Sequence, residues 1–176
     1  MIYLREIQLQ DISVINKWRN DNEVVDLLTA NFRYVNMDTD LKWYENYMQN
    51  RNSQVRCSIC LESTDKVIGA VYLTGIDYIN SSCDFGIMIG DKEYWNKKIG
   101  TIVIKKILNH AFNNIGLNRI SLVALEDNSR AINVYQKAGF IKEGIARQAI
   151  YKNGKFKNLI YMSIIKEDYI KLPEDK

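Results

Sequence analysis

The sequence predicts a mixed α/β (α+β) domain, in which helices flank a largely antiparallel sheet of six to seven strands. Apolar runs of strand length alternate along the chain with stretches whose apolar residues recur at helical spacing. One apolar-striped helix links two apolar strands, which is the crossover that a parallel strand pair requires. The other strands follow one another through short turns, so we expect them to pair antiparallel.

Length and composition indicate one globular domain. We assign residues 1–170 of the 176 to this domain and expect a frayed tail at 171–176. The chain is 47% hydrophobic and 26% charged, which is typical of a soluble protein, and its net charge of +3 is too small to indicate a nucleic-acid partner. No apolar run approaches the roughly 20 residues of a membrane span, and the first residues lack a secretory pattern, so we expect no membrane partner and a cytoplasmic location.

Three cysteines, an odd number, argue against a disulfide framework. Cys57 and Cys60 have CxxC spacing, but they lie in an apolar run that reads as a strand. Residues three apart on a strand point to opposite faces, so this pair cannot easily hold one ion. Because His110 is the only histidine and no second CxxC occurs, we predict buried structural cysteines and no metal.

The first half of the chain reads as one strand, a group of helices and a hairpin. Apolar residues recur at helical spacing after Asp11, which is therefore a candidate helix cap. Asp38 or Thr39 stands in the same position before a later amphipathic stretch. We expect strands at 2–7, 55–62 and 67–76, and helices at 12–20, at 23–28 and from 38 or 39 onward.

The second half contains the parallel pair and a final hairpin. Asp127, Asn128 and Ser129 are three consecutive cap candidates for a helix that Gly139 ends, and Asn153-Gly154 is a strong hairpin-turn signal. We expect strands at 84–89, 119–125, 140–151 and 156–165, and helices at 98–114 and 130–138. The strands at 84–89 and 119–125 flank the crossover helix and are the natural parallel pair.

The turn between residues 90 and 98 has the features of an anion site. The strand that begins at Asp84 leads through this lysine-rich turn into a helix, whose first N–H groups point outward and whose dipole favours negative charge. Lys97 and Lys98 stand at the mouth, where a diphosphate would lie. The alternative is an ordinary strand-to-helix connection with solvated lysines.

The segment that follows the second parallel strand resembles a known signature. The spacing of Asn128, Ala131, Tyr135, Lys137 and Gly139-Phe140 is similar to the second motif of the GNAT superfamily of acyl-CoA-dependent N-acetyltransferases. The strand–turn–helix described above resembles the pyrophosphate motif of that family, and the order of elements matches along essentially the whole chain. The resemblance implies a GNAT-like sheet whose parallel pair is splayed around the CoA site. It is strongest to the subgroup of ribosomal-protein N-terminal, spermidine and nucleotide-amino-sugar acetyltransferases.

One departure from the family pattern concerns the phosphate turn. Gly100 matches, but Lys98 stands where the pyrophosphate motif usually has glycine, and Asn96 stands where this subgroup often has another. A side chain at these positions restricts the backbone, while Lys98 adds a positive charge.

The resemblance implies acetyl-CoA as the cosubstrate, without a metal. Asn128 would hydrogen-bond the pantetheine arm, although helix capping explains this residue nearly as well. Backbone N–H groups at the strand end would polarise the thioester carbonyl. The implied cofactor-binding residues are Ile87, Met88 and Ile89 at the strand end, Lys97, Lys98, Ile99, Gly100 and Thr101 at the diphosphate, and Asn128 and Tyr135.

Two residues are candidates for the chemistry. A tyrosine is protonated at neutral pH and can donate to the departing thiolate, so we predict Tyr135 as the acid; the alternative is a tyrosine of the core. Asp84 stands where family members often carry a carboxylate that takes the proton of the amine, and we predict it as the base; the alternative is a solvated strand-end residue.

The acceptor is the least determined feature of the sequence. Trp18, Arg19 and Trp43 resemble the nucleotide-amino-sugar acetyltransferases, since aromatic faces stack on bases or sugars and an arginine pairs with a diphosphate. The alternative is that the tryptophans, at helical spacing, belong to the core and that Arg19 forms a salt bridge. From the resemblance we expect a nucleotide-linked amino sugar. The alternatives are a peptide α-amine, such as a ribosomal-protein N-terminus, and a polyamine; a CoA-binding module without turnover is an alternative of another class. The resembling subgroup also makes a homodimer one assembly to consider.

Overall fold

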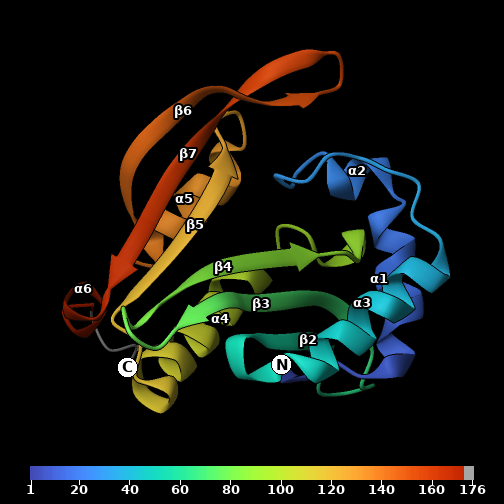
Figure 1. Ribbon diagram of the computed structural model, residues 1–176, viewed down its shortest axis with the longest axis horizontal. Helices are drawn as coiled ribbons and strands as arrows, with labels where there is room; N and C mark the ends of the chain where they lie inside the picture. Colours follow the sequence, from blue (N-terminus) through green and yellow to red (C-terminus); the bar gives the residue numbers. More distant parts are fainter. Residues whose placement is uncertain (173–176) are drawn as a thin grey trace.

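Seven strands form one sheet in the order β1-β2-β3-β4-β5-β7-β6, in a computed structural model that describes residues 1–172 (Figure 1). All neighbouring strands are antiparallel except β4 and β5. The strands are β1 (Ile2–Glu6), β2 (Val55–Leu61), β3 (Val67–Asp77), β4 (Ser82–Ile89), β5 (Arg119–Leu125), β6 (Ile141–Lys152) and β7 (Lys155–Ile165). The predicted mixed sheet is therefore confirmed.

Helices cover both faces of the sheet. The α-helices are α1 (Ile12–Arg19), α2 (Asn22–Val25), α3 (Met37–Gln49), α4 (Ile99–Asn109), α5 (Ser129–Lys137) and α6 (Lys166–Ile170). Helices α1 and α3 pack on one face, where Ile15 and Tyr47 belong to the same buried cluster as Met88 of β4. Helix α4 packs on the other face, where Ile104 and Leu108 join the larger core.

The parallel pair diverges, as the family resemblance implies. Strands β4 and β5 are paired only between residues 82–84 and 119–121. Beyond that point β5 stays paired with β7 along its whole length, so the β5-β7-β6 part of the sheet swings away from β4 (Figure 1). The gap between the two strands is the structural basis of the site described below.

The caps of two helices differ from those predicted. Asp11 does not cap α1; its buried carboxylate accepts hydrogen bonds from Arg5 Nη1 at 2.7 Å and from Ser58 Oγ at 2.6 Å. Asn36, rather than Asp38 or Thr39, caps α3, because its Oδ1 accepts from the Thr39 backbone N–H at 2.9 Å. In both cases the neighbouring structure, and not the helix end, decides which polar side chain is used.

Other local signals are found as predicted. Asn128 caps α5 through the N–H of Ala131, and Gly139 ends that helix with a φ of +95°. Asn153 and Gly154 form the hairpin turn with φ values of +52° and +76°. The predicted helix at 98–114 ends as α4 at residue 109 and continues as a π-helical turn over 110–115.

The C-terminal segment and the cysteines complete the fold. Leu172 packs against the core near Gly139, while residues 173–176 of the predicted frayed tail lie outside the described residues. Cys57, Cys60 and Cys83 are free thiols, and Cys60 and Cys83 are buried. Within residues 1–172, no helix is both long enough and apolar enough to cross a membrane.

Candidate active site

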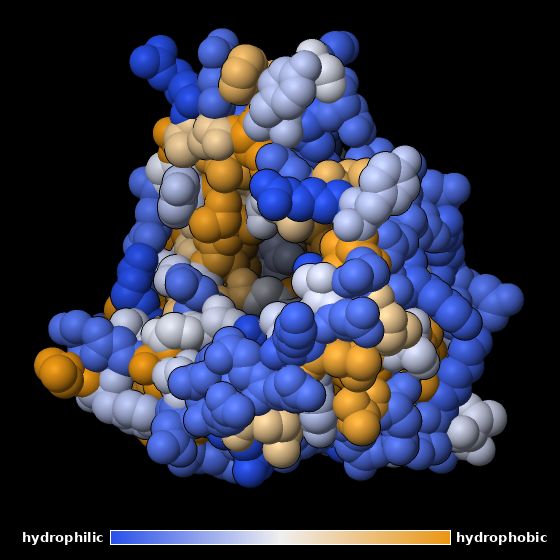
Figure 2. All heavy atoms as spheres, turned by 45° about the vertical axis from the view of Figure 1, so that its right-hand side comes forward, coloured by the Kyte–Doolittle hydropathy of each residue, from blue (hydrophilic) through white to orange (hydrophobic). Residues whose placement is uncertain are grey.

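A cleft of about 1200 Å³ opens where β4 and β5 diverge. Figure 2 shows the face of the molecule that is hollowed, with hydrophobic side chains gathered along part of the wall. We call the side formed by residues 84–101 and 122–137 the cofactor half. The acceptor half is the side formed by α1, the 24–35 segment, α3, β2 and β3.

The divergence leaves one edge of β4 open to the cleft. Residues 85–89 pair with β3 on one side but have no strand partner on the side of β5. Every second residue of this stretch therefore turns its backbone N–H and C=O toward the cleft. Ile87, Met88 and Ile89 all line the cleft, but the Ile89 carbonyl already accepts a hydrogen bond from Trp95 Nε1 at 2.7 Å. The part of this edge that an extended amide-containing ligand could pair with therefore lies before that carbonyl.

At one end of the cleft lies the N-terminus of α4. The first N–H groups of a helix lack intrahelical partners, and here they belong to Ile99, Gly100 and Thr101, which line the cleft together with Lys98. Lys97 lies outside this lining, because its ammonium group is held over the Tyr94 ring at 5.0 Å. The anion site predicted from the sequence thus has its backbone donors and one of its two lysines at the cleft.

The two non-glycine residues in this turn adopt backbone conformations that favour glycine. Asn96 has a φ of +62° and Lys98 a φ of +59°. The left-handed conformation costs a residue with a side chain about 1–2 kcal/mol, and less for asparagine. The turn therefore follows a glycine-like path even though its two usual glycines are replaced.

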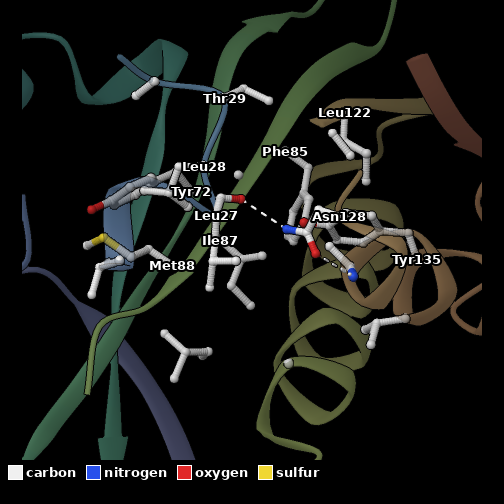
Figure 3. Close-up of a pocket in the computed structure, with 18 of the residues that line it drawn as sticks. Leu27, Leu28, Thr29, Tyr72, Phe85, Ile87, Met88, Leu122, Asn128 and Tyr135 are labelled. Carbon is white, nitrogen blue, oxygen red and sulfur yellow. Dashed lines mark hydrogen bonds between the residues drawn. The ribbon is translucent and has the colours of Figure 1, made fainter. Parts of the chain in front are cut away.

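Tyr135 projects from α5 into an aromatic cluster at the edge of the cleft (Figure 3). Its ring centroid lies 6.1 Å from that of Phe85 and 6.0 Å from that of Phe140, both in edge-on arrangements. Burial raises the pKa of Tyr135 to about 12. The hydroxyl therefore carries its proton throughout the neutral and mildly alkaline range.

Asp84 lies at the point where the two strands separate. It is opposite Ser121 in the last pair of the parallel ladder, and its Oδ1 accepts a hydrogen bond from Ser121 Oγ at 2.9 Å. Side chains alternate along a strand, so Asp84 lies on the opposite face of β4 from Phe85 and the Tyr135 cluster. Asp84 is exposed to the cleft on the face that carries Tyr72 of β3.

Asn128 connects the two halves of the cleft. Its Oδ1 accepts from the Ala131 N–H at 3.1 Å, and its Nδ2 donates to the Leu27 carbonyl at 3.0 Å (Figure 3). The capping role is therefore present, and the amide nitrogen that would serve a pantetheine arm is directed at the 24–35 segment.

The acceptor half contains two of the three residues that the sequence assigns to the substrate. Trp43 and Arg19 line the cleft, and Arg19 forms an ion pair with the buried carboxylate of Asp40. Trp18 does not line it, because its ring packs directly against the backbone of Gly90 in the core.

Sequence reasoning missed two residues of this half, Arg56 and Tyr72, and one that holds it in place, Lys152. Arg56 and Tyr72 line the cleft from neighbouring strands, and nothing in their local sequence distinguishes them from other strand residues. Lys152 is buried at the tip of the β6-β7 hairpin, and its Nζ donates to the carbonyls of Val25, Leu28 and Ala30 at 2.6–2.9 Å. A lysine beside a predicted hairpin turn carries no sign of such a role.

Comparison with known proteins places this geometry in a family. Residues 2–141 match the family model described as an acetyltransferase (GNAT) domain. The N-acetyltransferase p20 of Bacillus licheniformis is 26% identical, over 94% of this chain and 93% of its own length. Spermidine N(1)-acetyltransferase of Vibrio cholerae is 25% identical, over 97% and 96%. The crystal structure of the spermidine N-acetyltransferase from Vibrio cholerae in complex with CoA and spermine superimposes with a TM-score of 0.90 at 24% identity, covering 97% of this chain and 98% of that one.

Proposed function

The chain belongs to the GNAT family of acetyltransferases and is an acetyl-CoA-dependent N-acetyltransferase, and we propose how its own residues carry out that transfer. The observation that supports the proposal most is the open edge of β4, which has an anion-binding helix end beside it and a protonated tyrosine behind it. On its other face the same strand presents the carboxylate of Asp84. A proton donor (Tyr135), a proton acceptor (Asp84) and an open backbone edge thus line one cleft.

The cleft fits acetyl-CoA by its chemistry. Backbone N–H groups of Ile99, Gly100 and Thr101 suit a diphosphate, and Lys98 and Arg130, which also line the cleft, add positive charge. The open edge at residues 85–89 suits the amides of a pantetheine arm, and an N–H of this stretch is placed to stabilise a developing oxyanion. Acetyl-CoA supplies the thioester whose carbon–sulfur bond is broken as the acceptor nitrogen forms the new amide bond.

We assign the proton transfers from the two faces of β4. Asp84 takes the proton that the acceptor amine loses, directly or through a water, on the face shared with Tyr72. Tyr135 gives its proton to the leaving sulfur on the other face, and its pKa of about 12 means that the proton is present at neutral pH. The two roles are separated because a strand presents alternate side chains to opposite faces.

Two acceptor classes have support. The relatives named as spermidine acetyltransferases match almost the whole chain, and they favour a polyamine over the nucleotide-linked amino sugar predicted from the sequence. The amino-sugar prediction also depended on Arg19 pairing with a diphosphate, but Arg19 is engaged by Asp40. Trp43 remains in the cleft and suits a base or a sugar ring.

The experiment is the release of CoA thiol from acetyl-CoA with three acceptors: spermidine, a nucleotide-linked amino sugar and a short peptide with a free N-terminus. We expect turnover with a small amine and acetylation of its nitrogen, identified by mass spectrometry. Acetyl-CoA binding without turnover by any primary amine would contradict the proposed transfer and would favour a CoA-binding module.

A further inference from the structure

The acceptor half of the cleft is positively charged. Three guanidinium groups line it, from Arg19, Arg33 and Arg56, whereas Asp84 is the one carboxylate among the described residues that line the cleft. Asp40 neutralises Arg19 from within the core and does not itself line the cleft. The positive charge of Arg33 and Arg56 therefore exceeds the negative charge of Asp84, so the cleft surface that faces the acceptor carries a net positive charge.

Arg56 is the most constrained of these groups. Its guanidinium carbon lies 4.7 Å from the ring centroid of Trp43, 4.9 Å from that of Tyr72 and 5.8 Å from that of Tyr47. The aromatic rings hold the guanidinium in place by cation–π contact and leave little rotational freedom. A guanidinium fixed in this way is prepared to bind a planar anion.

The charge of Arg56 lacks a carboxylate within ion-pair distance in the described part of the chain. Its Nε donates to Gln54 Oε1 at 2.8 Å, while a guanidinium has five N–H donors in all. The group is half-buried, and burial lowers the pKa of Arg56. A half-buried cation without a counter-ion is costly for a fold, and an anionic ligand would offset that cost.

The sheet places Arg56 within reach of the reaction centre. Arg56, Tyr72 and Gly86 are cross-strand partners in one row over β2, β3 and β4, and Asp84 lies two residues before Gly86 on the same face. Strands lie about 4.8 Å apart, so β2 is roughly 10 Å from β4. Gly86 has no side chain, which leaves the floor of the cleft open between Tyr72 and β5.

We propose that the acceptor is a primary amine that also carries an anionic group, a carboxylate or a phosphate, and that Arg56 binds this group while the amine lies at Asp84. The proposal rests on the acetyl transfer argued above and specifies its substrate class. A polyamine in the same position would bring a second ammonium group toward Arg56 and Arg33, where like charges repel. Arg33, which is exposed at the cleft, adds attraction for the same anion.

The test compares amines that differ only in the charge at the far end. Butylamine, γ-aminobutyrate and putrescine share a four-carbon chain with a neutral, an anionic and a cationic end. Glucosamine and glucosamine 6-phosphate form a second set, in which only the latter carries a phosphate. We expect the anionic member of each set to have a kcat/KM about tenfold or more above its neutral partner, and putrescine to be the poorest of the first set. The sets also separate a carboxylate from a phosphate.

The variant Arg56→Gln assigns the preference to this residue. It should abolish the advantage of the anionic amines over their neutral partners, and Arg56→Lys should restore part of it. Arg51→Gln is the matched control, because Arg51 is an exposed arginine paired with Glu6 outside this cleft. Thermal unfolding of each variant identifies any loss of fold.

Direct binding measurements separate the proposed anion site at Arg56 from the proposed acetyl transfer. Calorimetric titration of glucosamine 6-phosphate and γ-aminobutyrate into the CoA-bound protein measures the anion site without turnover. Faster turnover of putrescine or spermidine than of the anionic amines, or an unchanged preference in Arg56→Gln, would overturn the role of Arg56 and leave acetyl transfer intact. If an anionic amine binds through Arg56 but no amine is acetylated, acetyl transfer is wrong and the anion site stands. If there is neither binding nor turnover, both are wrong.

Discussion

The cofactor half of the cleft is built mainly from two continuous segments, the β4–turn–α4 unit and α5, whereas the acceptor half gathers side chains from α1, the 24–35 segment, α3, β2 and β3. The first half presents mostly backbone groups, at the open edge of β4 and at the end of α4. The second presents side chains such as Arg56 and Trp43 that meet only because the sheet and helices pack as they do.

This difference explains how each half responds to substitution. Backbone recognition tolerates a change of residue if the chain keeps its path, and Asn96 and Lys98 do keep a glycine-like path. Side-chain recognition depends on the chemistry of each residue, so a single exchange in the acceptor half changes what the cleft can bind. The family resemblance is therefore a better guide to which cofactor the cleft binds than to which acceptor it binds.

The largest effect is expected at Tyr135, the residue of the cofactor half whose proposed role depends on its side chain and not on its backbone. Tyr135→Phe should lower kcat by about a hundredfold or more, because general acid catalysis contributes roughly 10²–10⁴-fold. The affinity for acetyl-CoA, measured by calorimetry, should change little. Tyr151→Phe, at an exposed tyrosine of the final hairpin, is the control. Unchanged turnover in Tyr135→Phe would show that the acid is another group or water.

The joint between the hairpin and the acceptor half gives the next effect. Lys152→Met leaves the carbonyls of Val25, Leu28 and Ala30 without their shared donor, which should cost about 2–4 kcal/mol of unfolding free energy. The KM for the acceptor should rise more than the KM for acetyl-CoA, because Lys152 holds the 24–35 segment. Urea unfolding and steady-state kinetics measure both, with the exposed Lys155→Met as control. Equal changes in the two KM values would contradict the prediction that Lys152 supports the acceptor half more than the cofactor half.

A purely structural contact beneath the acceptor half is expected to have a smaller effect. A Cβ at Gly90 would collide with the Trp18 ring, so Gly90→Ala should lower the free energy of unfolding by about 1–3 kcal/mol. Gly144→Ala is the matched control, since a Cβ there meets nothing within 4 Å. If both variants unfold at the same urea concentration, Trp18 is not packed against Gly90 as described.

The smallest effect concerns the ion pair between Arg119, at the start of β5, and Glu143 of β6. Arg119 and Ser163 hold the pKa of Glu143 at about 2, below its usual value of about 4.5. The interaction therefore stabilises the fold above about pH 4.5 and is lost as the pH falls toward 2. Because Glu143 and Arg119 are about two-fifths exposed, with side-chain values of 41% and 38%, solvent screening keeps the gain below about 1 kcal/mol.

Urea unfolding of Glu143→Gln and of the native chain at pH 6 and pH 3 tests this prediction. The difference between the two proteins should shrink at pH 3, while acetyl transfer at pH 7 stays unchanged. Glu62→Gln, at an exposed glutamate that follows β2, serves as the control. A difference that grows as the pH falls would contradict the assigned direction.

The elements that the sequence determined are those whose causes are local. Apolar periodicity marks strands and helices, the Asn153-Gly154 turn sets the final hairpin, and a crossover helix requires the parallel pair. The lysine-rich turn and the segment from Asn128 to Tyr135 are likewise continuous, so the family motifs that they resemble could be recognised in the sequence and predicted the cofactor half.

Contacts between distant segments were decided only by the tertiary structure. Asp11 reads as a helix cap but pairs with Arg5 and Ser58, and Trp18 reads as a substrate contact but packs on Gly90. Strand register places Arg56 beside Tyr72, and helix docking then brings the Trp43 ring centroid within 4.7 Å of the guanidinium carbon. Such contacts depend on how whole elements pack, since no local pattern specifies which polar or aromatic side chain will find a partner dozens of residues away.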